Sequence, residues 1–82
     1  MKTKYKFIHF KEWTSTTWII YNRKHKNKLG EITFTKDWKR FVFVPQPETI
    51  WSSDCLRDIA DFLDQLQKEK KADKVIKIVR NG

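Results

Sequence analysis

Apolar and polar residues alternate along the first half of the chain, and this alternation predicts β-strands. The alternating segments are rich in aromatic and β-branched residues, which favour a pleated surface, and short polar stretches separate them. Pro45 ends the last segment, because proline cannot donate a hydrogen bond to a neighbouring strand. The four expected strands cover residues 4–10, 16–23, 29–35 and 40–44.

The second half of the chain carries one helical pattern. Apolar residues recur at three- and four-residue spacing over residues 56–66, and Ser52 or Ser53 can cap the first turn. We therefore expect a helix over residues 53–69, which ends in a lysine-rich run. The β-branched cluster at residues 74–79 could then form a fifth strand, either on this sheet or on that of a partner.

Strands followed by a helix predict an α+β fold. Short connections between the strands favour antiparallel pairing. We expect an antiparallel meander of three or four strands packed under one C-terminal helix, with the tail strand as an open addition. The chain has 82 residues, so we expect residues 1–82 to form a single small domain with a modest core.

Composition excludes several classes of protein. Two glycines are too few for a glycine-rich phosphate loop, and a single cysteine excludes a disulfide framework. No apolar run approaches the length of about 20 residues that a membrane span needs. The N-terminal lysines are not followed by the apolar segment of a secretory signal. We therefore expect a soluble cytoplasmic protein that has no cofactor and does not bind membranes.

Positive charge is concentrated in the half of the chain that predicts strands. The formal net charge is +8; residues 1–44 hold 11 basic and 3 acidic residues, whereas residues 45–82 hold 7 of each. Ten of the twelve aromatic residues also lie in residues 1–44. A sheet that combines cations with aromatic rings suits single-stranded nucleic acid, because lysine and arginine neutralise phosphates and rings stack on bases.

The candidate binding residues come from the second expected strand and from two lysine-rich hairpins. One helix covers only one face of a sheet, so some aromatic residues must lie on the open face or beneath a partner, although alternation does not decide which. Two other interpretations stay open: the lysines protect strand edges, and the aromatic residues form an ordinary core. The candidates for nucleic-acid binding are Trp18, Tyr21, Arg23, Lys24, Lys26, Lys28, Lys36, Trp38, Lys39 and Arg40.

Catalysis and metal binding have weaker support in the sequence. His9 and His25 are the only histidines, and nothing in their spacing brings them together. Cys55 flanks the apolar stripe of the helix, where a small buried residue is the simpler interpretation. The aspartates of the helix lie on its polar side, as expected for a solvated surface. We therefore expect no enzymatic activity, no catalytic residue and no metal site.

Residues 29–66 carry a run of motifs: Leu-Gly-x-Ile, then Trp-Lys-x-Phe-x-Phe-x-Pro, then Thr-x-Trp and Cys-Leu-x-Asp-Ile-x-x-Phe. This run resembles a group of small uncharacterised proteins from phages, prophages and bacterial genomes. In that group an Arg stands in the place of Lys39 and a Tyr in the place of Phe41. The resemblance implies a phage or mobile-element origin and brings no assigned activity. The matching residues are Leu29, Gly30, Ile32, Trp38, Phe43, Pro45, Thr49, Trp51, Cys55, Leu56, Asp58, Ile59 and Phe62.

These observations predict a small non-enzymatic nucleic-acid-binding module of phage or mobile-element type, with single-stranded DNA or RNA as its partner. The order of strands and helix is also similar to that of the Whirly-type coactivators, which bind single-stranded DNA as dimers, so a homodimer is one expectation. The alternative is a protein-interaction module, such as a phage-encoded modulator of a host protein. In that case the strand at residues 74–79 would add to the sheet of the partner.

Overall fold

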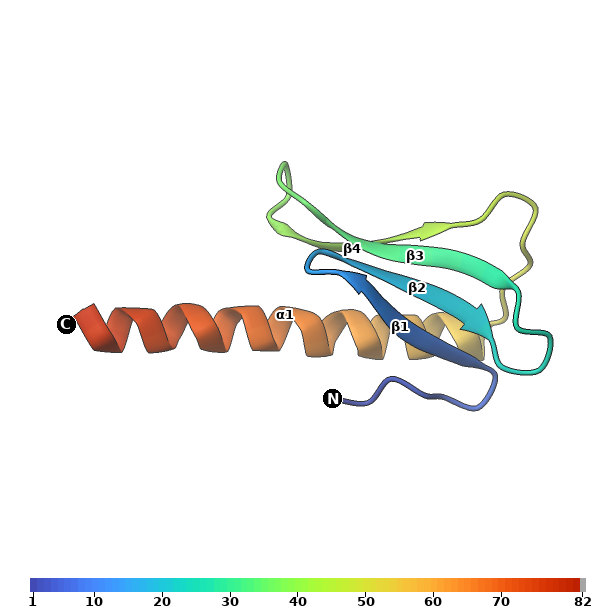
Figure 1. Cartoon of the computed structure of the whole chain (residues 1–82), viewed down its shortest axis with the longest axis horizontal. Helices are drawn as coiled ribbons and strands as arrows, with labels where there is room; N and C mark the ends of the chain where they lie inside the picture. The colour runs from blue at the N-terminus through green and yellow to red at the C-terminus, as the bar shows by residue number, and fades with distance from the viewer. Residues whose placement is uncertain (82) are drawn as a thin grey trace.

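The computed structural model describes the backbone of residues 1–81 and the side chains of residues 1–69. Four strands follow one another in a single antiparallel sheet, and one helix follows the last strand (Figure 1). The α+β meander with a C-terminal helix that the sequence predicts is therefore confirmed. The elements are β1 (Ile8–Thr14), β2 (Thr17–Asn22), β3 (Lys28–Thr35), β4 (Arg40–Pro45) and α1 (Ser53–Asn81).

Helix α1 packs across one face of the sheet. In the strand register Phe10 lies opposite Ile20, so alternate residues of β1 and β2 point toward the helix. The ring of Phe62, which is fully buried, stacks on the ring of Phe10 with the two centroids 3.9 Å apart. The core consists of Tyr5, Ile8, Phe10, Ile20, Ile32, Ile59, Phe62 and Leu66.

Gly30 lies where β4 approaches β3 closely. A Cβ atom at this position would lie 2.7 Å from the carbonyl oxygen of Val44 and 3.0 Å from Cε1 of Phe43. A larger residue would therefore push β4 away from β3. Because Gly30 has no Cβ, there is room for the ring of Phe43 beside it. This ring packs edge-on against Trp51, with the centroids 5.0 Å apart.

The first strand begins later than its sequence pattern predicts. A strand was expected over residues 4–10, whereas β1 begins at Ile8 and ends at Thr14. The residues before β1 fold back along it. The N–H group of Tyr5 donates to the carbonyl of Ile8 at 2.9 Å, and the N–H group of Phe10 donates to the carbonyl of Thr3 at 2.8 Å. These residues share the β-propensity of a strand, but they form a return turn beside β1.

Tyr5 fixes this N-terminal segment to the helix. Its ring is buried and packs edge-on against Phe10. Its hydroxyl donates a hydrogen bond to Asp61 of α1 at 2.6 Å. Burial first, and then the hydrogen bond to Asp61, raises the pKa of Tyr5 above its ordinary value. The N-terminal segment is thus part of the packed structure.

The tail of the chain is helical, so the strand predicted over residues 74–79 is wrong. Helix α1 continues to Asn81 and is longer than the expected helix of residues 53–69. No glycine or proline interrupts this stretch, and the lysine-rich run after Glu69 consists largely of good helix formers. Helix propagation therefore overrides the β-propensity of the valines and isoleucines in the tail. A partner cannot pair with this segment as a strand while it is helical.

Candidate nucleic-acid interface

The strand register decides which residues of β2 face away from the helix. Tyr21 lies opposite His9 on the open face, and the two rings stack with their centroids 5.4 Å apart. Trp18 lies on the other side of the sheet and packs edge-on against Phe62, with the centroids 5.0 Å apart. Ile19 and Tyr21 therefore lie on the open face, where the side chain of Ile19 is buried and that of Tyr21 is half-buried. Trp18 belongs to the layer between sheet and helix.

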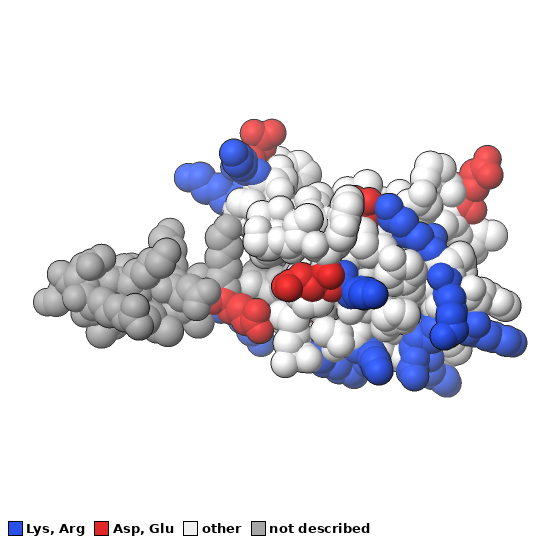
Figure 2. All heavy atoms as spheres, in the orientation of Figure 1, with Lys and Arg blue, Asp and Glu red and all other residues white. Residues whose placement is uncertain are grey.

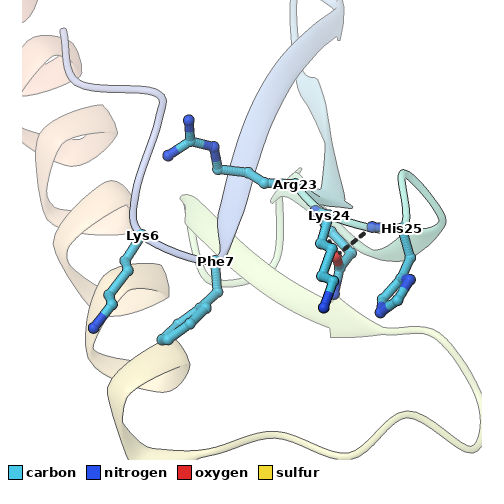
Figure 3. A pocket seen from close by; sticks show the side chains of 6 residues that line it. Lys6, Phe7, Arg23, Lys24 and His25 are labelled. Carbon is cyan, nitrogen blue, oxygen red and sulfur yellow. Dashed lines mark hydrogen bonds between the residues drawn. The ribbon is translucent and has the colours of Figure 1, made fainter.

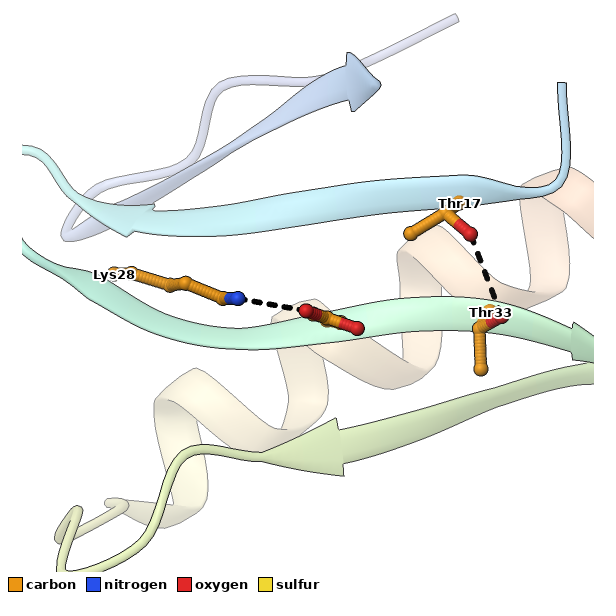
Figure 4. A network of polar contacts seen from close by, with 4 residues as sticks. Thr17, Lys28 and Thr33 are labelled. Atoms are coloured by element: carbon orange, nitrogen blue, oxygen red, sulfur yellow. Dashed lines mark hydrogen bonds and ion pairs between the residues drawn. The ribbon is translucent and has the colours of Figure 1, made fainter. Parts of the chain in front are cut away.

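The middle of the open face carries little net charge. Lys28 and Glu31 form an ion pair at 2.6 Å, and the hydroxyls of Thr17 and Thr33 are hydrogen-bonded at 3.4 Å. Figure 4 shows both contacts on the side of the sheet that faces away from α1. Because Glu31 neutralises it, Lys28 is a weaker candidate for a phosphate contact than the other predicted lysines.

The two lysine-rich hairpins lie at opposite ends of the sheet, because successive turns of an antiparallel meander alternate between its ends. The β2–β3 loop, residues 23–27, lies at one end. The β3–β4 turn lies at the other end and carries Trp38, whose side chain is 70% exposed. The ten predicted residues therefore do not form one surface. Those at the far end, hereafter the turn end, are Lys36, Trp38, Lys39 and Arg40.

The N-terminal segment adds cations beside the β2–β3 loop. The N–H group of Arg23 donates to the carbonyl of Phe7 at 2.9 Å, and its guanidinium donates to the carbonyl of Tyr5 at 2.7 Å. These bonds bring residues 4–7 next to the loop, although some 16 positions separate them in the chain. Arg23 thus has a structural role besides the predicted one. Sequence reasoning missed Lys4, Lys6 and Phe7, because the only signal for them was a lysine-rich N-terminus.

A shallow pocket of about 630 Å³ lies between the loop and the N-terminal segment. The ring of Phe7 is 47% exposed, and the ammonium of Lys6 lies 5.2 Å from its centroid. Figure 3 shows the side chains of Lys6, Phe7, Lys24 and His25 pointing to the same side, whereas Arg23 turns toward the N-terminal segment. The lining residues are Lys6, Phe7, Asn22, Arg23, Lys24 and His25.

Asn22 fixes the shape of the loop. Its side-chain oxygen accepts hydrogen bonds from the N–H groups of Lys24 and His25, both at 2.8 Å (Figure 3). Its carbonyl accepts a third bond from the N–H group of Lys26, whose φ of 63° is in the left-handed region. The loop is therefore a defined turn, and its backbone sets the positions from which its basic side chains extend.

His9 lies in the field of the surrounding cations. Burial first, and then four nearby cations, lowers the pKa of its imidazole below the ordinary value. The same field favours an anion bound at this end of the sheet. The four cations are Lys4, Arg23, Lys26 and Lys11.

The pocket and the surroundings of His9 together form one surface, the basic end. Figure 2 shows lysine and arginine gathered at the lower right, where Figure 1 places the β2–β3 loop and the turn before β1. At the turn end, basic and acidic side chains lie close to each other in the same view. The basic end comprises Lys4, Lys6, Phe7, His9, Lys11, Arg23, Lys24, His25 and Lys26.

The histidines and acidic side chains of the described residues bear on other kinds of site. No group of three His, Cys, Asp or Glu residues that could hold a metal ion occurs among the residues described. His9 stacks on Tyr21, whereas His25 lines the pocket, and in residues 1–69 no hydrogen bond joins the two imidazoles. Within residues 1–81, no helix combines the length and the apolar character needed to cross a bilayer.

No protein-family model, curated protein or solved structure matches this chain. The resemblance of residues 29–66 to phage proteins therefore stays a prediction. Functional inference rests on the geometry of the basic end, where an exposed aromatic ring lies among several cations.

Proposed function

We propose that this chain is a non-enzymatic module that binds single-stranded nucleic acid at the basic end. One observation carries the proposal: residues 4–7 and the β2–β3 loop converge around the exposed ring of Phe7. Lys6 and Lys24 point to the same side as this ring, so a phosphate can contact them while the adjoining base stacks on Phe7. In a duplex the bases are already stacked on one another and cannot reach the ring.

The stacked pair His9 and Tyr21 offers a second aromatic contact on the adjoining open face. His9 lies two residues after Phe7, and its neighbours Lys4 and Lys26 supply positive charge there. Each base that stacks on an aromatic side chain contributes about 1–3 kcal/mol. A short strand that contacts both rings would therefore gain affinity from bases as well as from phosphates, which a purely electrostatic surface does not provide.

Fluorescence anisotropy with a labelled single-stranded oligonucleotide at low salt tests the proposal. The double variant Lys6→Glu, Lys24→Glu should bind about tenfold or more weakly than the wild type, because both cations face the pocket. The matched control is Lys36→Glu, Lys39→Glu, which changes the net charge equally at the turn end and should lose much less affinity.

Two outcomes would contradict this proposal. Equal losses in both double variants would mean that only the overall charge attracts the oligonucleotide, and no binding by the wild type at low salt would rule out nucleic acid as the partner. A duplex of the same sequence serves as the second probe. It should bind more weakly than the single strand, since it offers phosphates but no free base faces.

A further inference from the structure

A second pocket lies at the turn end, where α1 leaves the sheet. It has a volume of about 310 Å³ and lies between the β1–β2 turn, the neighbouring ends of β3 and β4, and the helix. Three of its eight described lining residues are aromatic, and the rings of Phe34 and Phe41 pack edge-on with their centroids 5.4 Å apart. The lining residues are Glu12, Ser15, Thr16, Trp18, Phe34, Phe41, Leu66 and Glu69.

Two carboxylates also line this pocket. Glu12 lies opposite Trp18 in the register of β1 and β2, so both side chains are on the side of the sheet that faces the helix. Glu69 lies one helical turn after Leu66, which is buried. Both glutamates are exposed, and neither has an ion-pair partner among residues 1–69.

Two carboxylates of residues 1–69 form ion pairs, and Glu12 and Glu69 are not among them. Glu31 pairs with Lys28 at 2.6 Å, and Asp54 pairs with Arg57 at 2.8 Å. Within residues 1–69 the lining of this pocket has two carboxylates and no lysine, arginine or histidine, whereas the pocket of the basic end is lined by Lys6, Arg23, Lys24 and His25. The two pockets thus lie at opposite ends of the sheet and differ in the charge of their described lining residues.

We propose that this pocket binds the side chain of a lysine from a partner polypeptide. The aliphatic part of a lysine would lie against Trp18 and Phe41, and its ammonium would be attracted by the ring faces and by the carboxylates. Glu12 and Glu69 come from different elements, a strand and a helix. The ammonium group of a lysine has three donors, which it can share between two carboxylates.

The negative charge of Glu12 and Glu69 disfavours other kinds of ligand in this pocket. An anion would be repelled by both glutamates, and a neutral apolar side chain would cover the carboxylates without giving them a partner. This site does not depend on nucleic-acid binding, since it shares no residue with the basic end. A protein that used both would hold a nucleic acid at one end and a basic polypeptide at the other.

NMR titration of the isotope-labelled full chain tests the inference. The probe is a lysine with acetylated N-terminus and methylamidated C-terminus, and the matched control ligand is the same compound made from norleucine, which lacks the ammonium. The lysine compound should shift the indole signal of Trp18 and the amide signals of Ser15 and Thr16 with millimolar affinity, and the norleucine compound should not. Equal shifts from both ligands, or none from the lysine compound, would overturn the inference.

Two variants test whether the carboxylate charge at the pocket contributes to lysine binding. Glu12→Gln keeps the size of the side chain and should weaken lysine binding about threefold or more, because one charge is lost. Glu48→Gln, a glutamate in the loop between β4 and α1, removes the same charge away from the pocket and should leave binding unchanged. If both variants bind lysine like the wild type, the carboxylates do not recognise the cation and the assignment is wrong.

Discussion

The pKa of His9 depends on the charges at the basic end. Burial and the nearby cations keep its pKa low, and its ring stacks on Tyr21 in the free protein. A phosphate bound close to His9 would supply negative charge and favour the protonated imidazole. Binding of a nucleic acid and protonation of this residue are therefore linked, and each should strengthen the other.

The pKa of His9 should rise when a single-stranded oligonucleotide binds. Because the bound form then has the higher pKa, affinity should increase as the pH falls through the interval between the bound and free values, and should level off above it. NMR titration of the imidazole signals, with and without the oligonucleotide, measures both values. His9→Gln should flatten the pH dependence of affinity. An unchanged pKa of His9 in the saturated complex would place the phosphates elsewhere.

Individual residues show where sequence reasoning succeeds and where it stops. Lys24 and Lys26 are prominent in the sequence because they lie in a polar hairpin, and the structure places both at the basic end. Lys6 and Phe7 looked like part of a strand. Their position depends on hydrogen bonds between distant residues, such as that from Arg23 to Phe7, and no local pattern encodes such a bond.

The helix holds the N-terminal segment in place, and this links the core to the candidate site. Gln65 of α1 accepts a hydrogen bond from the N–H group of Lys2 at 2.8 Å and donates one to the hydroxyl of Tyr5 at 2.9 Å. Asp61 accepts the hydrogen bond of the same hydroxyl. The segment that carries Lys6 and Phe7 is thus held by hydrogen bonds to α1 and also contacts the β2–β3 loop.

Docking of α1 should depend strongly on Phe62. Its ring is fully buried between Phe10 and Trp18, so Phe62→Ala should lower the free energy of unfolding by about 3–5 kcal/mol. Chemical denaturation followed by circular dichroism measures this. Leu56→Ala on the same helix is the control, since that side chain is 45% exposed and should cost less than about 1 kcal/mol.

A loss for Phe62→Ala no larger than that for Leu56→Ala would mean that the aromatic stack does not hold the helix to the sheet. Phe62→Leu keeps most of the apolar volume and removes the stack. It should give an intermediate loss and remain measurable if the alanine variant does not fold.

The elements themselves are largely predictable, and their errors have physical causes. The strands expected at residues 16–23, 29–35 and 40–44 correspond to β2, β3 and β4, because alternation on a half-buried sheet is a local pattern. The tail differs because its β-branched residues follow a helix that nothing in the sequence stops. Propensity alone cannot tell whether such a segment continues the helix or leaves it.

On the scale of the whole molecule, charge divides between the two ends of the sheet. A net charge of +8 attracts any polyanion at low salt, but the sequence alone gives a single basic half rather than a location. The meander separates the two lysine-rich hairpins, and the returning N-terminal segment reinforces only one of them. The predicted basic sheet half thus becomes a basic end and, opposite to it, a turn end with a pocket that two glutamates help to line.

The most direct measurement is a chemical-shift map of the isotope-labelled chain titrated with a single-stranded oligonucleotide. Binding at the basic end predicts that the largest shifts fall on Phe7, His9 and the β2–β3 loop, with the turn around Trp38 little affected. These shifts should diminish as salt is added, since the contacts to phosphates release counterions. Shifts centred on Trp38 and Lys39, or no shifts at low salt, would contradict nucleic-acid binding at the basic end.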